Sequence, residues 1–240
     1  MYEERNYRKL FKGINLHFFN VSVFETDLCI GAEKNLYNEA LYAVKKYRNQ
    51  IEAYIKMYPD FLTSLEPVSF KPGSSVIIQR MCTAAEKAGV GPMAAVAGAI
   101  AEMVGMDLLK YSNEVIVENG GDIYLKTKEH RKIGVFAGKS PFSEKICLEI
   151  APEDTPLGVC TSSGTVGHSL SFGKADAAVI LADDAFLADA VATATGNRVK
   201  TWEDIDAAIE FASGIEGVKG VLIIVGDKMG AYGNIKLAPF

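Results

Sequence analysis

The amino-acid sequence predicts an α+β fold with a largely antiparallel sheet and packed helices. Helix-periodic and strand-periodic segments occur in blocks rather than in strict alternation, which disfavours a doubly wound parallel sheet. Asn-Gly-Gly-Asp at 119–122 separates two segments with a β period, 114–118 and 123–126, and Asn-Gly between strands is a strong hairpin signal. No internal repeat, low-complexity tract or linker stands out, so we expect residues 1–240 to form a single domain.

The first elements are a predicted hairpin and a long helix. Residues 14–23 and 27–32 are rich in aromatic and β-branched types and are expected to pair as two strands. Between residues 33 and 58 apolar side chains recur every three or four positions, which indicates an amphipathic helix. Pro59 should end this helix, because the residue before a proline disfavours helical geometry.

Two more helices are expected at 74–88 and 93–110, separated by Gly-Val-Gly-Pro. Ser74 or Ser75 suits the N-cap of the first, and Pro92 suits the start of the second. The second is rich in alanine and carries glycines at a spacing of seven, Gly91, Gly98 and Gly105. An interior glycine costs a helix about 1 kcal/mol relative to alanine. We therefore expect another backbone or a flat ligand to approach this face closely, with a sheet as the commoner neighbour.

In the rest of the chain we expect several short strands and two helices. The expected strands are residues 132–137, 146–150, 157–161, 177–181, 218–225 and an edge strand at 234–237. The expected helices are residues 184–195 and 201–212.

Composition excludes several classes of protein. The chain is 49% hydrophobic and 23% charged, which fits a globular protein with a sizeable core. A net charge of −5 disfavours a general nucleic-acid binder. The four cysteines are scattered, without zinc spacing or a disulfide framework, as expected in a reducing compartment. We see no signal sequence and no run of about eighteen apolar residues, so we expect a cytoplasmic protein that does not span a membrane.

A stretch rich in serine and glycine, followed by an alanine-rich helix, is the strongest candidate for chemistry. Asp189 and Thr193 lie four residues apart and share one helical face. An acid and a hydroxyl near a helix N-terminus suit a hard cation that holds a phosphate. The same acid would also simply complement the helix dipole. The glycine-rich loop at 158–173 either holds a phosphate through its amides or is a solvated loop.

Motifs of the commonest enzyme classes are missing from the sequence. We find no Gly-x-Ser-x-Gly elbow, no Walker loop and no Gly-x-Gly-x-x-Gly after a strand. A serine hydrolase and a nicotinamide-binding Rossmann domain are therefore disfavoured. Among the three histidines, only His168 lies inside the Ser/Gly loop, which makes it the one candidate for proton transfer.

Three segments, taken in order, carry a resemblance to a known family. Residues 118–123, Glu-Asn-Gly-Gly-Asp-Ile, look like an Asn-x-Gly-Gly-Asp-Ile turn, and residues 188–194 look like an Ala-Asp-Ala-Leu-x-Thr-Ala helix. Residues 93–109 stand where a Gly-Ile-Ala-Lys-Gly helix is expected. The chain resembles the ApbE-like family, whose best-known members are FAD:protein FMN transferases. The resemblance covers roughly residues 91–225 and is greatest to compact members without an export signal.

The resemblance implies an α+β fold of T-fold-like type, with FAD or FMN and Mg²⁺ as cofactors. In the family the motif Asp and Thr hold the magnesium ion, which assigns Asp189 and Thr193 as metal ligands. A main-chain carbonyl also contributes there, and counting back from Asp122 places it at Ala95, with Ala94 as the alternative.

The flavin itself would lie against the Gly-Gly turn and the Ser/Gly loop. The implied residues are Asn119, Gly120, Gly121, Asp122, Ser162, Ser163, Gly164 and Ser169. His168 would assist proton transfer, and the acceptor would be a serine or threonine of another protein. The sequence leaves the oligomeric state open.

Departures from the family pattern keep other functions open. The family lysine is replaced by Val96 or Ala97, and the family's His-Ile-Ile-Asp-Pro-x-Thr-Gly segment is missing, with 168–171 as its nearest remnant. A non-catalytic flavin carrier or sensor is therefore one alternative. A metal-dependent phosphoesterase acting on another nucleotide is a second, and a structural subunit without a ligand is a third.

Overall fold

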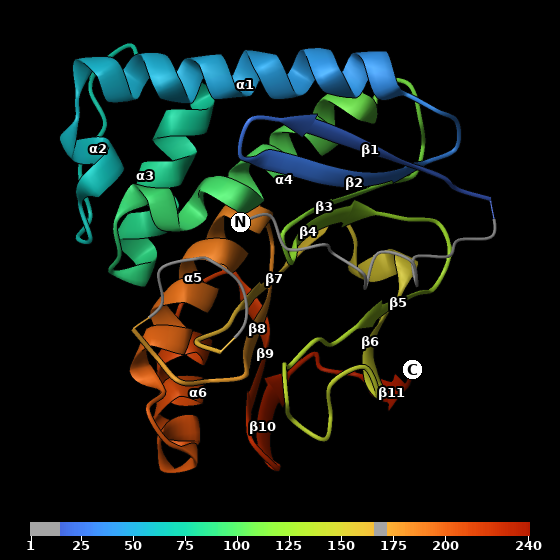
Figure 1. The fold of residues 1–240 in the computed structure, drawn as a ribbon, viewed down its shortest axis with the longest axis vertical. Helices are drawn as coiled ribbons and strands as arrows, with labels where there is room; N and C mark the ends of the chain where they lie inside the picture. The colour runs from blue at the N-terminus through green and yellow to red at the C-terminus, as the bar shows by residue number, and fades with distance from the viewer. Residues whose placement is uncertain (1–14, 166–171) are drawn as a thin grey trace.

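A computed structural model describes residues 15–165 and 172–240 of the chain (Figure 1). The larger of its two sheets has eight strands in the order β1-β2-β3-β4-β7-β8-β9-β10. Each pair of adjacent strands in this sheet is antiparallel, as the sequence predicts. The strands are β1 (His17–Val23), β2 (Thr26–Ala32), β3 (Val115–Asn119), β4 (Asp122–Lys126), β7 (Leu157–Ser162), β8 (Ala177–Ala182), β9 (Val218–Val225) and β10 (Lys228–Gly233).

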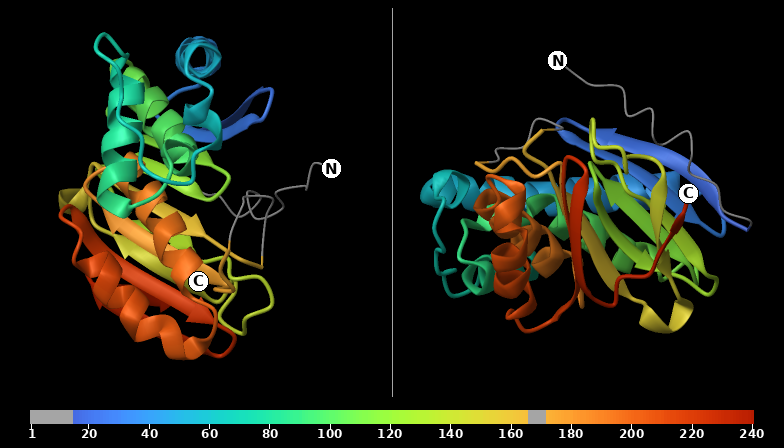
Figure 2. Two further views of the ribbon diagram at one scale, coloured as in Figure 1. Left: turned by 90° about the vertical axis from the view of Figure 1, so that its left-hand side faces the viewer. Right: turned by 90° about the horizontal axis from the view of Figure 1, so that it is seen from below.

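A second, smaller sheet has three strands in the order β11-β6-β5, also antiparallel. These strands are β5 (Arg131–Gly134), β6 (Ile146–Ile150) and β11 (Leu237–Pro239). The small sheet faces one side of the large sheet, and the helices cover the other (Figures 1 and 2).

The α-helices are α1 (Tyr37–Met57), α2 (Asp60–Thr63), α3 (Val76–Ala88), α4 (Val96–Leu108), α5 (Ala185–Arg198) and α6 (Ile205–Ser213). Within the described residues, they are accompanied by the short 3-10 helices η2 (Pro92–Ala95), η3 (Pro152–Asp154) and η4 (Trp202–Asp204). In Figure 1, α1 lies across the top of the molecule, while α5 and α6 lie beside β7 to β10.

The alternation of strand side chains explains this layered arrangement. On β8, Ala178 and Ile180 join the core beneath the helices, whereas Val179 and Leu181 join a second core beneath the small sheet. Successive strand residues point to opposite faces, so one apolar strand serves both cores. The central strands are consequently buried on both faces and read as nearly continuous apolar runs.

The predicted α+β class and the antiparallel sheet are confirmed, with local corrections. The helix expected at 93–110 begins as the 3-10 helix η2 and becomes an α-helix at Val96. Ser75 occupies the N-cap position of α3, but its side chain makes no capping hydrogen bond. The sequence reading missed α2 and β10. Both lack a clear period, because α2 has only four residues and β10 is an exposed edge strand containing two glycines.

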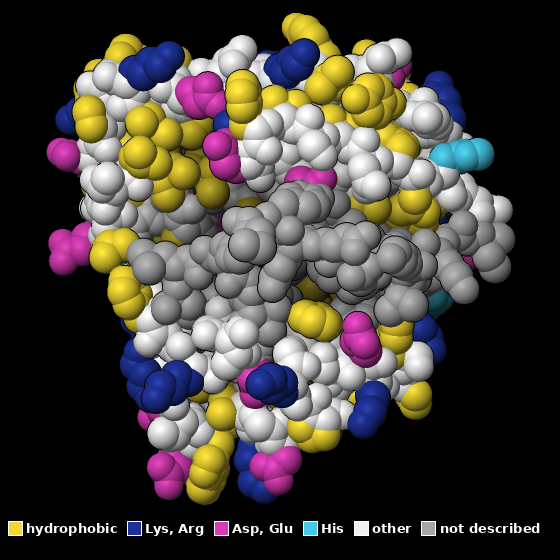
Figure 3. All heavy atoms as spheres, viewed as in Figure 1, with side chains coloured by type: hydrophobic (Ala, Val, Ile, Leu, Met, Phe, Trp, Pro, Cys, Tyr) yellow, Lys and Arg dark blue, Asp and Glu magenta, His cyan; other side chains and the backbone are white. Residues whose placement is uncertain are grey.

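One cluster of exposed apolar side chains lies at the corner formed by α1, α2 and α3 (Figure 3). Exposed apolar residues in these helices and in the segment that joins α2 to α3 include Met57, Leu62, Leu65 and Val76. Within the described residues, no single helix is long and apolar enough to cross a membrane. One pair, Val76–Ala88 with Pro92–Leu108, meets the length and composition test only when taken together across a bend of 105°.

Candidate functional site

The β3–β4 hairpin forms one wall of the candidate site. Asn119 pairs with Asp122 across a two-residue turn in which Gly120 and Gly121 have φ angles of 69° and 105°. Both angles lie in the region that favours glycine, as the Asn-Gly-Gly-Asp signal predicts. The Gly121 amide donates a 2.9 Å hydrogen bond to Oε1 of Glu118, so a buried carboxylate already holds this amide.

The start of α4 forms the second wall and is tied to the hairpin. Nδ2 of Asn119 donates a 3.1 Å hydrogen bond to the carbonyl oxygen of Ala97. Asn119, which the sequence assigns to the cofactor, therefore also fixes the first turn of α4. Ala95, the residue assigned to the metal carbonyl, is fully buried at the junction of η2 and α4.

Helix α5 contributes Asp189, whose carboxylate caps the N-terminus of α4. The Gly98 amide donates a 2.8 Å hydrogen bond to Oδ2 of Asp189, and the Ala97 amide also favours the charged carboxylate. Amides in the first turn of a helix have no partner within that helix, so an acceptor from another element satisfies them. Asp189 is nonetheless only 8% exposed, and this burial raises its pKa to about 7.

The close approach of α4 and α5 depends on Gly98. A Cβ at this position would lie 2.1 Å from the carbonyl oxygen of Ala185 and 2.9 Å from Cβ of Asp189. The glycine face predicted from the sequence is thus confirmed, although here its neighbour is a helix. Gly105, one repeat later, does face the sheet, where a Cβ would meet the ring of Tyr124 at 2.4 Å.

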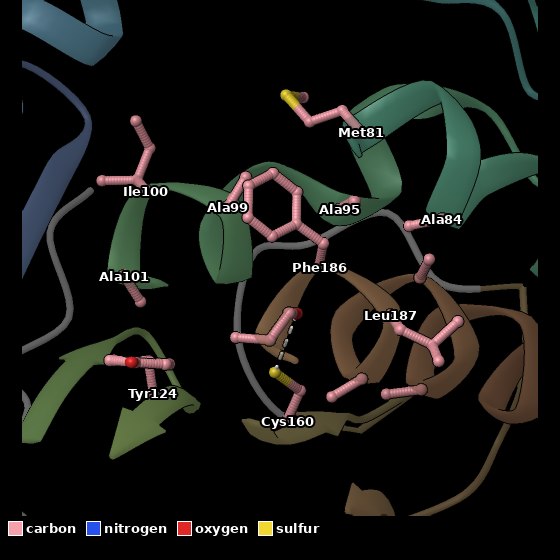
Figure 4. Packing of buried hydrophobic residues seen from close by; sticks show 14 of the residues in the cluster. Met81, Ala84, Ala95, Ala99, Ile100, Ala101, Tyr124, Cys160, Phe186 and Leu187 are labelled. Carbon is pink, nitrogen blue, oxygen red and sulfur yellow. Dashed lines mark hydrogen bonds between the residues drawn. The ribbon is translucent and has the colours of Figure 1, made fainter. Parts of the chain in front are cut away.

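Asp122 and Cys160 lie between the hairpin and α5. Burial raises the pKa of Asp122 well above its usual value, and the charge of Asp189 adds to the shift. Burial likewise raises the pKa of the Cys160 thiol, with the charge of Asp122 next in importance. The thiol also donates to the Ala185 carbonyl oxygen at 3.6 Å (Figure 4). Neutral forms of both groups are therefore favoured in the protein alone.

Another buried acid, Glu102, lies one turn beyond Gly98 on α4. Its Oε2 accepts a 2.6 Å hydrogen bond from the Ala185 amide at the start of α5. Its Oε1 is 2.6 Å from Arg80 Nη2, whose guanidinium lies 3.3 Å from Asp184. Burial raises the pKa of Glu102, and the charge of Arg80 opposes that rise. Glu102 therefore has a basic partner on α3.

The Ser/Gly loop begins beside the hairpin but uses some of its polar groups internally. Ser162 ends β7 opposite Ala178, and a Cβ on Gly196 of α5 would lie 3.1 Å from its hydroxyl oxygen. The Gly164 amide donates to the Ala175 carbonyl at 2.9 Å, and the Ser163 hydroxyl accepts from the Thr165 amide at 3.1 Å. His168 and Ser169, the remaining loop candidates, lie outside the described residues.

The structure thus brings together Asn119, the Gly-Gly turn, Asp122, the end of β7 and Asp189. Sequence reasoning missed Cys160, Glu118 and the Arg80–Glu102 pair. Glu102 carries a readable signal, because it is the one charged residue in the alanine- and glycine-rich segment 93–106. Cys160 carries none, since an isolated cysteine in a strand is typical of any core.

Comparison with known proteins decides the family. A family model described as "AbpE bacteria" matches residues 8–231. The chain belongs to this AbpE family. Two relatives, each named "UPF0280 protein", come from archaea. The one from Methanocella arvoryzae is 43% identical over 215 residues, covering 88% of this chain and 86% of the relative. The one from Archaeoglobus fulgidus is 38% identical over 228 residues, covering 92% and 94%.

Solved structures extend the likeness of this AbpE chain at the level of the fold. The ApbE protein from Thermotoga maritima is 15% identical with a TM-score of 0.56, covering 90% of this chain and 96% of that one. The flavin transferase ApbE from Vibrio cholerae is 11% identical with a TM-score of 0.55, covering 90% and 96%. These values confirm the ApbE-like architecture that the motifs imply.

The oxygen donors of the candidate site are of a kind that fits a magnesium ion. The described residues contain no group of three or more His, Cys, Asp or Glu side chains that could hold a metal. Magnesium does not need one, because it usually takes one or two carboxylates and completes its shell with water and substrate phosphate. Asp189 and Asp122 are buried close enough for the charge of one to raise the pKa of the other. Thr193 lies partly buried one turn after Asp189 on α5.

Proposed function

We propose that this protein binds a flavin nucleotide together with a divalent cation where the β3–β4 hairpin, the end of β7 and the N-termini of α4 and α5 meet. The observation that carries the proposal is the contrast between two buried acids. Glu102 is paired with Arg80, whereas the groups that lower the pKa of Asp189 are two backbone amides. A buried carboxylate without a cationic side chain beside a second carboxylate is where an added cation is most stabilising.

The proposed ligands of the cation are Asp189, Thr193 and the carbonyl oxygen of Ala95 or Ala94. Asp122, beside them, adds negative charge that a cation would balance. The flavin would lie along Gly120, Gly121 and the end of β7, with Ser162, Ser163, Gly164 and Ser169 toward its phosphates. Asn119 supports this surface indirectly, by fixing the first turn of α4 against the hairpin.

The leading activity is transfer of FMN from FAD to a serine or threonine of an acceptor protein. The hydroxyl oxygen of the acceptor would form a bond to the FMN phosphorus, the bond to the AMP phosphate would break, and the hydroxyl proton would pass to a base. His168 is the candidate base. Magnesium, when bound, would neutralise charge on the pyrophosphate as AMP leaves.

A flavin carrier or sensor is the second candidate, and one contact favours it. The Gly121 amide already donates to the Glu118 carboxylate, so it is less available to a phosphate than the sequence suggested. The start of α4 also has Val96 and Ala97 where the family resemblance expects a lysine. Both features leave fewer hydrogen-bond donors and positive charges at the site for binding the phosphates of the nucleotide, which a transferase has to hold in place.

Calorimetric titration of FAD with and without Mg²⁺ tests the proposed site. We expect Mg²⁺ to strengthen FAD binding in the parent protein and to have little effect in Asp189→Asn. Asparagine is the suitable replacement, because its oxygen still accepts from the Gly98 amide. Asp183→Asn is the matched control, since Asp183 is exposed at the start of α5 and bonded to Lys219 at 2.9 Å. Equal Mg²⁺ dependence in all three proteins would remove the metal role from Asp189.

Release of AMP from FAD, measured with an acceptor peptide, then separates the two candidate functions. A transferase releases AMP and leaves the peptide flavinylated. A carrier should bind flavin, which is detected by its absorption band, without releasing AMP.

A further inference from the structure

Helices α4 and α5 cap each other. Asp189 of α5 accepts from the Gly98 amide in the first turn of α4, and Glu102 of α4 accepts from the Ala185 amide that begins α5. The two bonds lie one helical turn apart and run in opposite chain directions, so the helices are joined at two points. Each bond satisfies an amide that its own helix leaves without a partner.

The Glu102 end of this joint is fixed by Arg80. Arg80 Nη2 lies 2.6 Å from Glu102 and 3.3 Å from Asp184, the N-cap of α5. The same guanidinium lies over the ring of Phe186, 4.0 Å from its centroid. Figure 4 shows this ring pointing from α5 toward Ala95 and Ala99. One side chain of α3 therefore contacts groups of both α4 and α5.

Position 98 itself has no side chain to set the register of α4 against α5, although the Phe186 ring packs close by. Gly98 brings the α4 backbone directly against the Ala185 carbonyl, and no side chain of position 98 interdigitates with α5. Smooth surfaces can slide, whereas a buried polar pair has one favourable geometry and so specifies register. The Glu102–Ala185 bond is such a polar contact, and it lies one helical turn from Asp189 along α5.

We infer that Arg80 and Glu102 are positioning residues for the cation site, and that they hold Asp189 so that one carboxylate oxygen stays on Gly98 and the other faces the ligand. The inference rests on the proposed function for the identity of that ligand. Neither residue is among the proposed ligands of the cation. They act by fixing the start of α5, from which Asp189 projects one turn later.

The test compares two double variants of the full chain. Arg80→Met/Glu102→Gln removes both charges and keeps an acceptor for the Ala185 amide. Arg131→Met/Glu114→Gln is the matched control, because this pair also joins an arginine to a buried glutamate, at 2.9 Å, but lies at the far end of β3 from the hairpin turn. Three quantities are measured: the melting temperature, the exchange rate of the Gly98 amide without metal, and Mn²⁺ affinity by electron paramagnetic resonance.

We expect both variants to melt earlier than the parent. Only Arg80→Met/Glu102→Gln should exchange the Gly98 amide faster and bind Mn²⁺ about ten-fold more weakly, as changes in the groups that orient a metal ligand often do. The single variant Glu102→Gln, which keeps Arg80, should fall between that double variant and the parent. It also provides a folded protein if the double variant does not fold.

The inference would be overturned if Arg80→Met/Glu102→Gln and Glu102→Gln both kept the Gly98 exchange rate and the Mn²⁺ affinity of the parent. Equal losses of affinity in the Arg131/Glu114 control would overturn it too, because the effect would then follow stability alone. Failure of the proposed function gives a different result. The parent and Asp189→Asn would bind Mn²⁺ equally, and Gly98 exchange in the metal-free protein would then decide the positioning role.

Discussion

Asp189 has two tasks that make different demands on its charge. As a cap for α4 it is best ionised, because the amides of Gly98 and Ala97 favour the carboxylate. As a buried group it is best protonated, and burial is the larger effect. The sequence suggested an acid in the first turn of its own helix. The structure instead places it against the first turn of a different helix, where its removal disturbs two elements.

The first prediction concerns the pH dependence of stability. The pKa of Asp189 is about 7 in the folded protein, whereas its ordinary value, which applies to the unfolded chain, is 3.8. Between these two pH values the folded state keeps a proton that the unfolded state releases. The contribution of Asp189 to the free energy of unfolding without metal should therefore fall as the pH rises from about 4 to about 7, and then level off.

Asp189→Asn should show a smaller fall over the same range, measured by urea unfolding at several pH values. Asp122, whose pKa is also raised, supplies the part that remains. If the variant and the parent lose stability equally over this range, Asp189 is ionised in the folded protein at low pH. If Mg²⁺ binds at this carboxylate, it should restore stability at about pH 8 more than at about pH 5, because protons compete with the ion.

The second prediction concerns the turn at Gly121. A Cβ there would meet nothing closer than the Thr161 carbonyl oxygen at 3.8 Å, so space does not exclude a side chain. Its φ of 105° does disfavour one, and for a β-branched residue most strongly. Gly121→Val should lower the free energy of unfolding by about 1–2 kcal/mol or more. Gly121→Asn, which tolerates positive φ, should lower it less. Equal losses in urea unfolding would show that the backbone angle is not the cause.

At the scale of elements, α4 shows what a pattern predicts and what it leaves open. The spacing of Gly91, Gly98 and Gly105 correctly predicted close approach. Each glycine nevertheless has a different neighbour: the Ser64 carbonyl, the Ala185 carbonyl and the Tyr124 ring. A glycine in such a pattern indicates that another part of the chain approaches the helix closely, but it does not tell which part. Only the tertiary fold identifies that neighbour.

The third prediction tests the contact between α4 and α5. Gly98→Ala should cost about 1–3 kcal/mol through overpacking, although alanine is the better helix former, because its Cβ would lie 2.1 Å from the Ala185 carbonyl oxygen. Gly98→Leu should cost more and weaken flavin binding. Gly214→Ala is the matched control at the end of α6, where the nearest atom would be an ordinary 3.4 Å away. A melting temperature for Gly98→Ala equal to that of the parent would contradict the close packing.

Most elements could be predicted from the sequence because each carries its own period. The boundaries of α1, β3, β4 and β9 follow from apolar spacing and from the Asn-Gly-Gly-Asp turn. The separate small sheet could not be predicted, because no local pattern tells a strand which partner it will choose. In the site, Asp122, Asp189 and the turn were readable as motifs. The capping of α4 by Asp189 and the Arg80–Glu102 pair were not, since each joins segments far apart in sequence.

At the scale of the whole molecule, the eight-stranded sheet joins the two cores. Its strands give alternate residues to the core beneath the helices and to the core beneath the small sheet. Loss of packing in one of these cores should therefore destabilise the other core as well. We expect the chain to unfold as one cooperative unit.

The fourth prediction follows from the sharing of one sheet by the two cores. Ile78→Ala removes a fully buried side chain beneath the helices, and Leu148→Ala removes one beneath the small sheet. Each should lower the free energy of unfolding by about 2–5 kcal/mol and shift the same single transition. Circular dichroism in the far ultraviolet and the fluorescence of Trp202 should give coincident curves. Two separate transitions, each sensitive to one substitution, would contradict a single unit.

The bond between Gly98 and Asp189 joins residues 91 positions apart. Contacts at such separation close late when a chain folds, because the entropy of closing a long loop must be offset first. The hairpin that carries Asp122 can form early, since its contacts are local. A refolding chain should thus acquire its secondary structure before it acquires any affinity for a cation. If metal binding is measured during refolding, its rate should therefore report the last step, in which α5 docks onto α4.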